Sequence, residues 1–228
     1  MNEIYSIVLL TLKICIISSL ISGIFAIFLA FYLGLNDNKF IKILKILINA
    51  FTSLPPVIAG VFVYLIFSKN GILGSLSWLY TEKVIIIAQI LIVTPIICAN
   101  IYPAVESIKS SFMETCLGLG LKKSKIFKQL LLEIENSIIS ALITGFGRAI
   151  SEVGAVMIVG GNIRYKTRVL TSAIVLENNK GNYSMSIRLG IILMLISFGV
   201  SFLAMIFSRR DDDKVKKLTS QNRRGNFI

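Results

Sequence analysis

Long uncharged apolar runs are the feature that most restricts what this chain can fold into. A helix needs about 20 apolar residues, each rising about 1.5 Å, to cross the roughly 30 Å hydrocarbon core of a bilayer. The predicted spans are Ile14 to Leu33, Ile46 to Phe67, Val84 to Val105, Ile138 to Val159 and Leu189 to Phe207. We therefore predict an all-α integral membrane protein with about five transmembrane helices in a single domain over residues 1–228.

Composition also favours lipid as the main solvent of these helices. Of the 228 residues, 55% are hydrophobic and only 16% are charged, which is more apolar than a soluble domain of this size needs. Lys13 is followed by a run of full membrane length and by no cleavage pattern of a signal peptide. We expect the first span to be retained.

Lysine and arginine predict the orientation, because cytoplasmic loops of membrane proteins carry an excess of these residues. Basic groups follow the first, third and fifth spans, which predicts an N-terminus outside and a C-terminus in the cytoplasm. The net charge of +12 thus indicates topology and contact with membrane lipid, and we expect no nucleic-acid partner. The cations are Lys39, Lys42 and Lys45, then Lys109, Lys122, Lys123, Lys125 and Lys128, then Arg209, Arg210, Lys214, Lys216, Lys217, Arg223 and Arg224.

No motif in the sequence predicts catalysis, a metal site or a cofactor. The chain has no histidine, and Cys15, Cys98 and Cys116 lack a paired spacing, so we expect neither zinc nor disulfides. Gly118 to Ser124 faintly resembles a phosphate-binding loop, but it lacks the four-residue gap between glycines and a preceding strand. We predict that the chain is not an enzyme and that a separate subunit must supply any ATP hydrolysis.

Prolines and ionisable residues interrupt two of the predicted spans. Pro55 and Pro56 should kink the second span, which suits either a bundle lining a path or ordinary helix packing. Arg148 and Glu152 lie four residues apart on one face of the fourth span, where they can neutralise one another. Ionisable residues at this depth indicate function, although an ion pair that fixes helix orientation is an equal alternative.

Two connecting segments carry further candidates. Residues 106–135 predict amphipathic helices broken near Gly118 and Gly120, either lying on the membrane surface or docking a partner. The outer loop, residues 161–188, has five cations opposed only by Glu177, a formal charge of +4. It can anchor headgroups, or it can attract an arriving anion through Arg164, Lys166 and Arg168.

Three stretches together resemble the permease subunits of binding-protein-dependent ABC importers of the molybdate, sulfate and tungstate group. SLPPVIAG, Ser53 to Gly60, resembles the double-proline motif of these permeases, and the wording of Gly147 to Ile163 is most similar to tungstate permeases. The cytoplasmic signature matches at Glu114, Gly120 and Leu132, is conservative at Leu130, and departs at Thr115, Cys116 and Glu133.

The resemblance implies a type I ABC importer permease fold, multi-pass in a prokaryotic plasma membrane. It implies a homodimer that works with an ABC ATPase subunit and an external oxyanion-binding protein, and tungstate as the imported ion. Residues 106–135 become the element that couples to the ATPase. The residues assigned to the translocation path or its gating are Pro55, Pro56, Arg148, Glu152, Gly160 and Gly161.

Three alternatives stay open at this point. Molybdate and sulfate are tetrahedral dianions like tungstate, so the chain can be a permease for either. An ion-coupled secondary transporter would use Arg148 and Glu152 as coupling residues and would show inverted repeats. A membrane scaffold would need neither the loop glycine nor a polar pair in a span.

Overall fold

The computed structural model describes residues 2–118, 120 and 123–202, and throughout these ranges the regular structure is helical, with no strand. This confirms the prediction of an all-helical membrane protein. Three helices are long and apolar enough to cross a bilayer, and up to five passes result if each of two bent helix pairs is one span. The helices are α1 (Asn2–Leu35), α2 (Lys39–Thr52), α3 (Pro56–Phe67), the 3-10 turn η1 (Gly74–Leu76), α4 (Glu82–Gly118), α5 (Lys123–Glu133), α6 (Glu135–Ile150), α7 (Gly154–Gly160), α8 (Leu170–Asn179) and the C-terminal helix Tyr183–Phe202.

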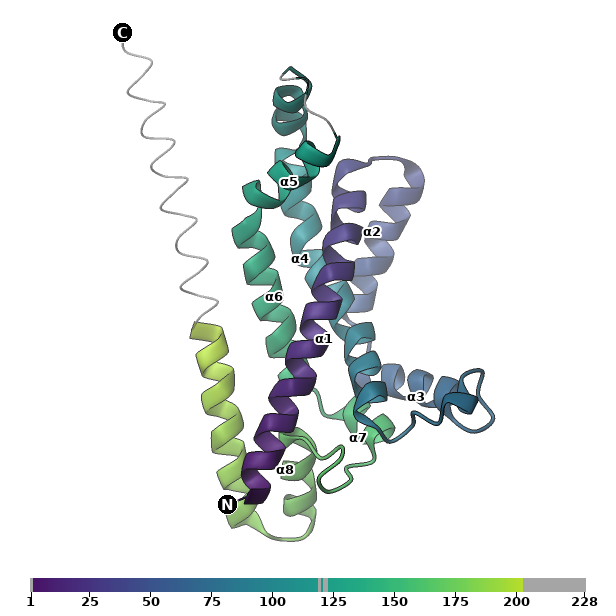
Figure 1. Cartoon of the computed structure of the whole chain (residues 1–228), viewed down its shortest axis with the longest axis vertical. Helices are drawn as coiled ribbons and strands as arrows, with labels where there is room; N and C mark the ends of the chain where they lie inside the picture. Colours follow the sequence, from purple (N-terminus) through teal and green to yellow (C-terminus); the bar gives the residue numbers. More distant parts are fainter. Residues whose placement is uncertain (1, 119, 121–122, 203–228) are drawn as a thin grey trace.

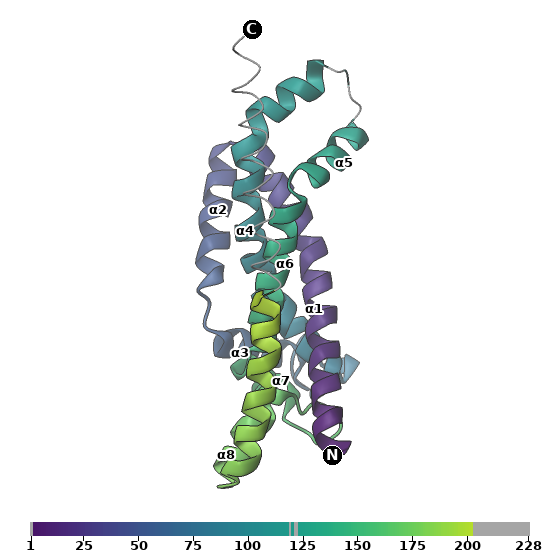
Figure 2. The ribbon, with the colours of Figure 1, turned by 90° about the vertical axis from the view of Figure 1, so that its left-hand side faces the viewer.

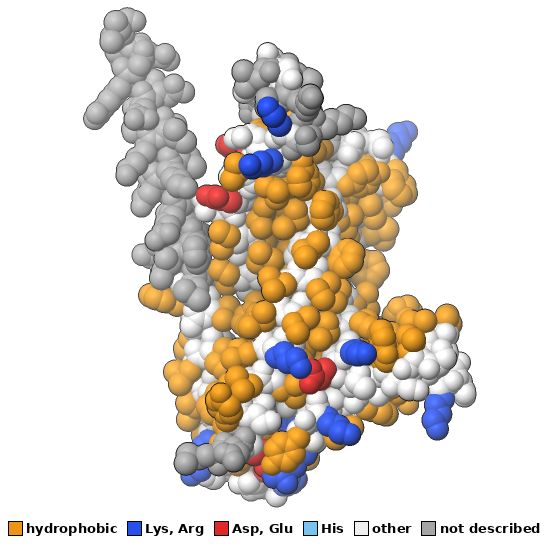
Figure 3. Space-filling view, viewed as in Figure 1, with side chains coloured by type: hydrophobic (Ala, Val, Ile, Leu, Met, Phe, Trp, Pro, Cys, Tyr) orange, Lys and Arg blue, Asp and Glu red, His pale blue; other side chains and the backbone are white. Residues whose placement is uncertain are grey.

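Four helices form the body of the molecule: α1, α2, α4 and α6 run roughly side by side, with α1 and α4 in contact along much of their length (Figure 1). Their shared core is built from isoleucine, valine, alanine and cysteine side chains of α1, α4 and α6. Hydrophobic side chains also cover the middle of the outer surface, while charged side chains gather near the upper and lower ends (Figure 3). This distribution is typical of helices surrounded by lipid.

The first helix is longer than the predicted span. α1 begins at Asn2 rather than at Ile14, so Lys13 lies inside the helix. The Nζ atom of Lys13 lies 2.6 Å from the Oε2 atom of Glu82 at the start of α4. The carboxylate of Glu82 thus offsets the charge of Lys13 where α1 passes the start of α4.

The predicted second span is not one helix. α2 ends at Thr52, α3 begins at Pro56, and the two helix axes differ by 101°. Proline lacks the N–H that would continue the α2 ladder and disfavours helical geometry in the residue before it, so two consecutive prolines break the helix instead of kinking it. Pro56 can still open α3, since the first N–H of a helix has no intrahelical partner.

The predicted fourth span is also interrupted, which corrects the continuous helix expected over Ile138 to Val159. α6 ends at Ile150 and α7 begins only at Gly154, so the residues between them form a break. At its other end α6 is bent by 67° relative to α5. Thus the double proline and the polar segment of the fourth span, the two interruptions predicted from the sequence, are both places where a helix stops.

The two ends of the molecule carry different elements (Figures 1 and 2). α5 and the far end of α4 lie at one end, while the start of α1, α7, α8 and the loop between α7 and α8 lie at the other. The C-terminal helix starts at Tyr183, six residues before the predicted Leu189, and returns alongside the bundle. The predicted end of this span at Phe207, the basic residues after it and Lys122 lie outside the described residues.

Candidate functional site

The two short helices that follow the breaks, α3 and α7, pack directly on one another. A Cβ atom placed on Gly60 would lie 2.6 Å from the Cα atom of Ala155, closer than real Cβ contacts allow. A Cβ atom on Gly154 would similarly lie 2.7 Å from the Cγ2 atom of Val57. Pro55 and Pro56 therefore act by setting where α3 begins, and small residues then let the two half-helices meet backbone to backbone.

Glu152 holds the break between α6 and α7 together with both oxygens of its carboxylate. Its Oε2 atom lies 2.9 Å from the Nη1 atom of Arg148, in the last turn of α6. Its Oε1 atom accepts a hydrogen bond of 3.1 Å from the backbone N–H of Ala155, in the first turn of α7. The Glu152 side chain is only 3% exposed, and the Arg148 side chain is 31% exposed. The predicted ion pair is formed, but it bridges a broken helix instead of lying on the face of an intact one.

A buried polar network beside this break was not predicted from the sequence. The side-chain amide of Gln89, in α4, donates a 3.2 Å hydrogen bond to the carbonyl of Ala149, and its oxygen accepts one of 2.7 Å from Ser18 in α1. Ala149 belongs to the last turn of α6, and its carbonyl also accepts the backbone N–H of Glu152 at 3.2 Å. Gln89 thus joins three helices next to Arg148. The sequence offered one sign of this network, since Gln89 places an amide side chain within the apolar run Val84 to Val105.

Gly160 and Gly161 end α7 and turn the chain into the outer loop. Gly161 has φ +66°, a left-handed conformation that glycine adopts without strain, and its N–H bonds to the carbonyl of Met157. The hydroxyl of Thr167 donates to the carbonyl of Gly160 at 2.5 Å, while a Cβ atom on Gly160 would lie 2.8 Å from the Cδ1 atom of Ile85. These two glycines shape the end of the half-helix and allow it to pack against α4.

The outer loop is less positive than the sequence predicted, because Glu3 of α1 reaches it. Glu3 accepts hydrogen bonds from Nε and Nη2 of Arg164, at 2.9 and 2.5 Å, and from Nη1 of Arg168, at 3.1 Å. The expectation that Glu177 alone opposes the five cations is therefore wrong. A residue 161 positions away in the chain could not be assigned to this loop before the helices were placed.

The remaining cations of the loop divide into paired and exposed ones. Lys180 lies 2.9 Å from Glu177. Lys166 is exposed, as is Arg188, and within the described ranges neither forms an ion pair. Of the three residues proposed to attract an anion, Lys166 is thus the one without an ion pair in the described part of the chain, whereas Arg164 is also exposed but is paired with Glu3.

The predicted coupling segment consists of the far end of α4, a turn and α5. α4 continues through Pro95 and Pro103 to Gly118, so its first part is no separate short helix. Gly120 lies in the turn with φ +60°, and a Cβ atom there would meet nothing within 4 Å. Backbone conformation, not space, is thus the reason for glycine at this position, which agrees with the turn predicted at Gly120.

α5 has one face held by the bundle and one face exposed. Leu130 is buried, and the ring of Phe127 stacks on Phe28 and meets the edge of Phe31, both in α1, at centroid distances of 5.7 and 5.1 Å. Leu132 points the other way and is 53% exposed. The residues of the cytoplasmic signature fall into two groups by exposure. Cys116 and Leu130 are buried, whereas Glu114, Thr115 and Leu132 are exposed.

A cluster of ion pairs joins the turn between α1 and α2 to α4 at the same end. Asp37 accepts a short hydrogen bond from Lys109 and lies 3.6 Å from Lys45, which in turn lies 3.2 Å from Glu106. The hydrogen bond from Lys109 holds the pKa of Asp37 below its usual range. Lys45 and Lys109, predicted only as topology signals, therefore also tie α2 and the α1–α2 turn to the helix that leads to Gly120.

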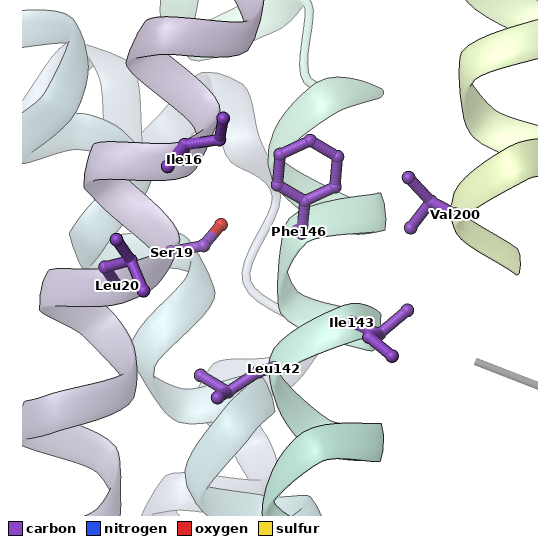
Figure 4. A pocket seen from close by; sticks show the side chains of 7 residues that line it. All are labelled: Ile16, Ser19, Leu20, Leu142, Ile143, Phe146 and Val200. Atoms are coloured by element: carbon purple, nitrogen blue, oxygen red, sulfur yellow. The ribbon is translucent and has the colours of Figure 1, made fainter. Parts of the chain in front are cut away.

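A cavity of about 280 Å³ between α1, α6 and the C-terminal helix has the wrong chemistry for an anion (Figure 4). Ser19 is its single polar lining residue, and the others are apolar. Such a lining offers too few hydrogen-bond donors to replace the hydration of an ion. The residues around it are Ile16, Ser19, Leu20, Leu142, Ile143, Phe146 and Val200.

Comparison with known proteins identifies a matching family and several similar proteins. A family model described as a binding-protein-dependent transport system inner membrane component matches residues 7–215. The tungstate uptake system permease protein TupB of Peptoclostridium acidaminophilum is 33% identical over 210 residues, covering 92% of this chain and 91% of the relative. TupB of Campylobacter jejuni is 33% identical over 167 residues, covering 73% and 70%. The sulfate transport system permease protein CysT of Escherichia coli is 25% identical over 213 residues, covering 88% and 76%.

Proposed function

Because the chain belongs to the family of binding-protein-dependent transport system inner membrane components, a family of multi-pass ABC permeases, we propose that it passes tungstate from an external binding protein to the cytoplasm. In this proposal ATP hydrolysis takes place in a separate ATPase subunit and drives the import. Tungstate is preferred because two relatives named for tungstate uptake are 33% identical to this chain. The sulfate permease CysT is more distant at 25% identity, so a sulfate or molybdate permease is the second candidate.

The observation that carries the coupling role is the two-faced helix α5. A helix can transmit motion from an ATPase only if one face is fixed to its own bundle while the other is free to bind. Phe127 and Leu130 supply the fixed face, and the exposed Leu132 belongs to the free one. The left-handed turn at Gly120 lets the chain reverse between α4 and α5 at this end.

The mechanism we infer is a switch between two conformations that ATP and its hydrolysis favour in turn. When two ATPase subunits close on ATP, they draw the coupling segments of two permease copies together and open the path outward. Hydrolysis then restores the inward-facing form. A break such as that between α6 and α7 can change its angle more readily than an intact helix, and Glu152 has contacts on both sides of it.

In this proposal the permease needs little affinity of its own for the ion. The external binding protein captures the oxyanion, and a tight site within the path would slow release. Exposed Lys166 offers attraction at the outer end without a closed binding pocket. Two copies of the chain would line the path, with Arg148 and Glu152 at its gate.

Reconstitution tests this proposal. The permease would be placed in liposomes with a candidate ATPase, and loaded binding protein would be added outside with tungstate, molybdate or sulfate. We expect tungstate to stimulate ATP hydrolysis and to accumulate inside. Stimulation by sulfate or molybdate alone would reassign the substrate, and uptake that follows a proton or sodium gradient without ATP would overturn the importer assignment.

A further inference from the structure

At the outer end of the molecule, one carboxylate is shared by two arginines. Glu3 receives three N–H donors, two from Arg164 and one from Arg168, at 2.5 to 3.1 Å. The side chains of Arg168 and Glu3 are 15% and 30% exposed, so their contact is partly withdrawn from water, whereas the Arg164 side chain is 56% exposed. Arginine pairs in such a setting are the usual protein ligands of carboxylate, phosphate and similar oxyanions.

The charges of this cluster do not balance. Arg164, Arg168 and Lys180 carry three positive charges against the two carboxylates Glu3 and Glu177. Glu177 is bound by Lys180 at 2.9 Å and by Asn182 at 2.8 Å, and its charge also acts on Arg168. A dianion would match the two arginines better than a monoanion does.

Room and an unused donor lie next to the pair. A cavity of about 200 Å³ is lined by Glu3, Arg168, Glu177 and Asn182 together with apolar side chains of α1, α8 and the C-terminal helix. The Nε atom of Arg168 is buried and has no hydrogen-bond partner in the part of the chain that the structure describes. A buried donor of this kind is costly unless an acceptor reaches it.

We propose that Arg164 and Arg168 form an outer anion site whose resting occupant is the carboxylate of Glu3, and that an incoming tetrahedral dianion displaces this carboxylate. The identity of the dianion as the transported ion rests on the proposed function. A tetrahedral oxyanion keeps the oxygen acceptors that the arginines already use and adds further oxygens and a second charge. Glu3 has solvent beside it and can be rehydrated when it leaves.

An internal competitor also explains how the site would release its ion. Glu3 belongs to the same chain and stays near the arginines, so it returns to them as the ion departs. The site is then selective for a dianion that outcompetes the carboxylate, yet it is too weak to trap the ion at the outer face. Weak retention is what a permease supplied by a separate binding protein requires.

Binding of tungstate to the isolated permease in lipid nanodiscs tests the site directly. Glu3→Gln removes the competing charge, and we expect it to tighten tungstate binding about tenfold, the effect of losing one charge-assisted contact. Glu82→Gln is the matched control, because Glu82 also lies in the first turn of a long helix and pairs with a partly exposed cation, Lys13. It should bind tungstate as the unaltered permease does. Combining Glu3→Gln with Arg168→Gln should abolish the gain.

A second measurement needs no substitution. On the unaltered permease, sulfate should displace tungstate, whereas perchlorate, tetrahedral with a single charge, should not. Equal or weaker tungstate binding by the Glu3→Gln variant, or equal displacement by perchlorate, would overturn the inference. Import by the reconstituted transporter is measured separately. If the transporter imports tungstate normally but the Glu3→Gln variant binds tungstate no more tightly than the unaltered permease, the proposed function stands and this site is rejected. Tighter binding without any oxyanion import keeps the site and rejects the proposed function.

Discussion

Gly60 and Ala155 bring α3 and α7 so close that a Cβ atom on Gly60 would lie 2.6 Å from the Cα atom of Ala155. The two residues come from the two helices that begin after the breaks, one after the double proline and one after Glu152. Backbone-to-backbone packing leaves no side chain that could move aside. The half-helices must therefore shift together or separate.

Gly60→Val should accordingly damage the protein more than an ordinary glycine substitution. Overpacking of a close contact costs about 1–3 kcal/mol, and the contact here is with backbone. We expect a lower unfolding temperature in detergent and reduced uptake by the assembled transporter. Gly190→Val is the control, because a Cβ atom at Gly190 meets nothing within 4 Å. Equal stability of the two variants would show that α3 and α7 are not held by this contact.

The pair Arg148 and Glu152 is tested by a double-mutant cycle. Glu152→Gln should destabilise by about 1–3 kcal/mol, because it leaves Arg148, which is 31% exposed, without its counter-charge. Combining it with Arg148→Gln should recover part of that loss, as measured by thermal unfolding and by uptake. No recovery in the double variant would mean that the two charges are not partners.

Glu152 has a second role that a different substitution isolates. Glutamine keeps an oxygen that can accept the N–H of Ala155, whereas leucine does not. Glu152→Leu in the Arg148→Gln background should therefore be less stable than the double glutamine variant. Equal stability would indicate that the hydrogen bond to the start of α7 contributes little.

Gly120 should be replaceable only by residues that tolerate a left-handed backbone. Gly120→Val should leave membrane insertion intact while weakening binding of the ATPase, since a β-branched residue at φ +60° is strained. Gly120→Asn should retain more activity, because asparagine visits this region. Gly118→Val is the matched control, since Gly118 has open space around it and is not in a left-handed conformation. ATP-driven uptake unaltered in Gly120→Val would remove the turn from the coupling mechanism.

Asp37 predicts a pH dependence of stability. Its pKa is lowered in the folded protein, mainly by the hydrogen bond from Lys109. A lowered pKa means that the stabilising contribution is complete above the ordinary carboxyl value and is lost as the pH falls through the lower, folded value. Unfolding temperature should thus drop below about pH 4 less steeply in Asp37→Asn than in the unaltered protein. Identical pH profiles would show that the Asp37 pair does not contribute.

Lys166 predicts a salt-dependent step at the outer face. Because exposed charges are screened over roughly 8 Å at physiological ionic strength, Lys166→Gln should slow uptake at low salt more than at high salt. Basal ATP hydrolysis by the assembled transporter should be unchanged. Neutralising Arg164 and Arg168 as well should also lower stability, since it leaves Glu3 unpaired. Equal loss at all salt concentrations for Lys166→Gln would indicate a structural role.

The helical class of the fold and the positions of its interruptions were readable from the sequence. Runs of about 20 apolar residues permit little except helices in lipid, because backbone polar groups there must be satisfied within each segment. Pro55, Pro56 and Gly120 were identified because proline and glycine act on the backbone locally, whereas Gly161 was assigned only from the family resemblance. The pairing of Arg148 with Glu152 was also predicted, because residues four positions apart lie on the same face of a helix.

Contacts between distant segments were decided only by the tertiary structure. Glu3 and Arg164 are 161 positions apart, and Ser18 and Gln89 are 71 apart, so no local pattern links them. The sequence predicted only a kink where the structure has a 101° bend between α2 and α3. A proline pair interrupts the backbone hydrogen bonds of a helix but does not specify the direction of the next helix. That direction depends on where the small residues of α7 offer a surface to Gly60. Local chemistry determines where helices stop, and packing among all of them determines which residues then meet.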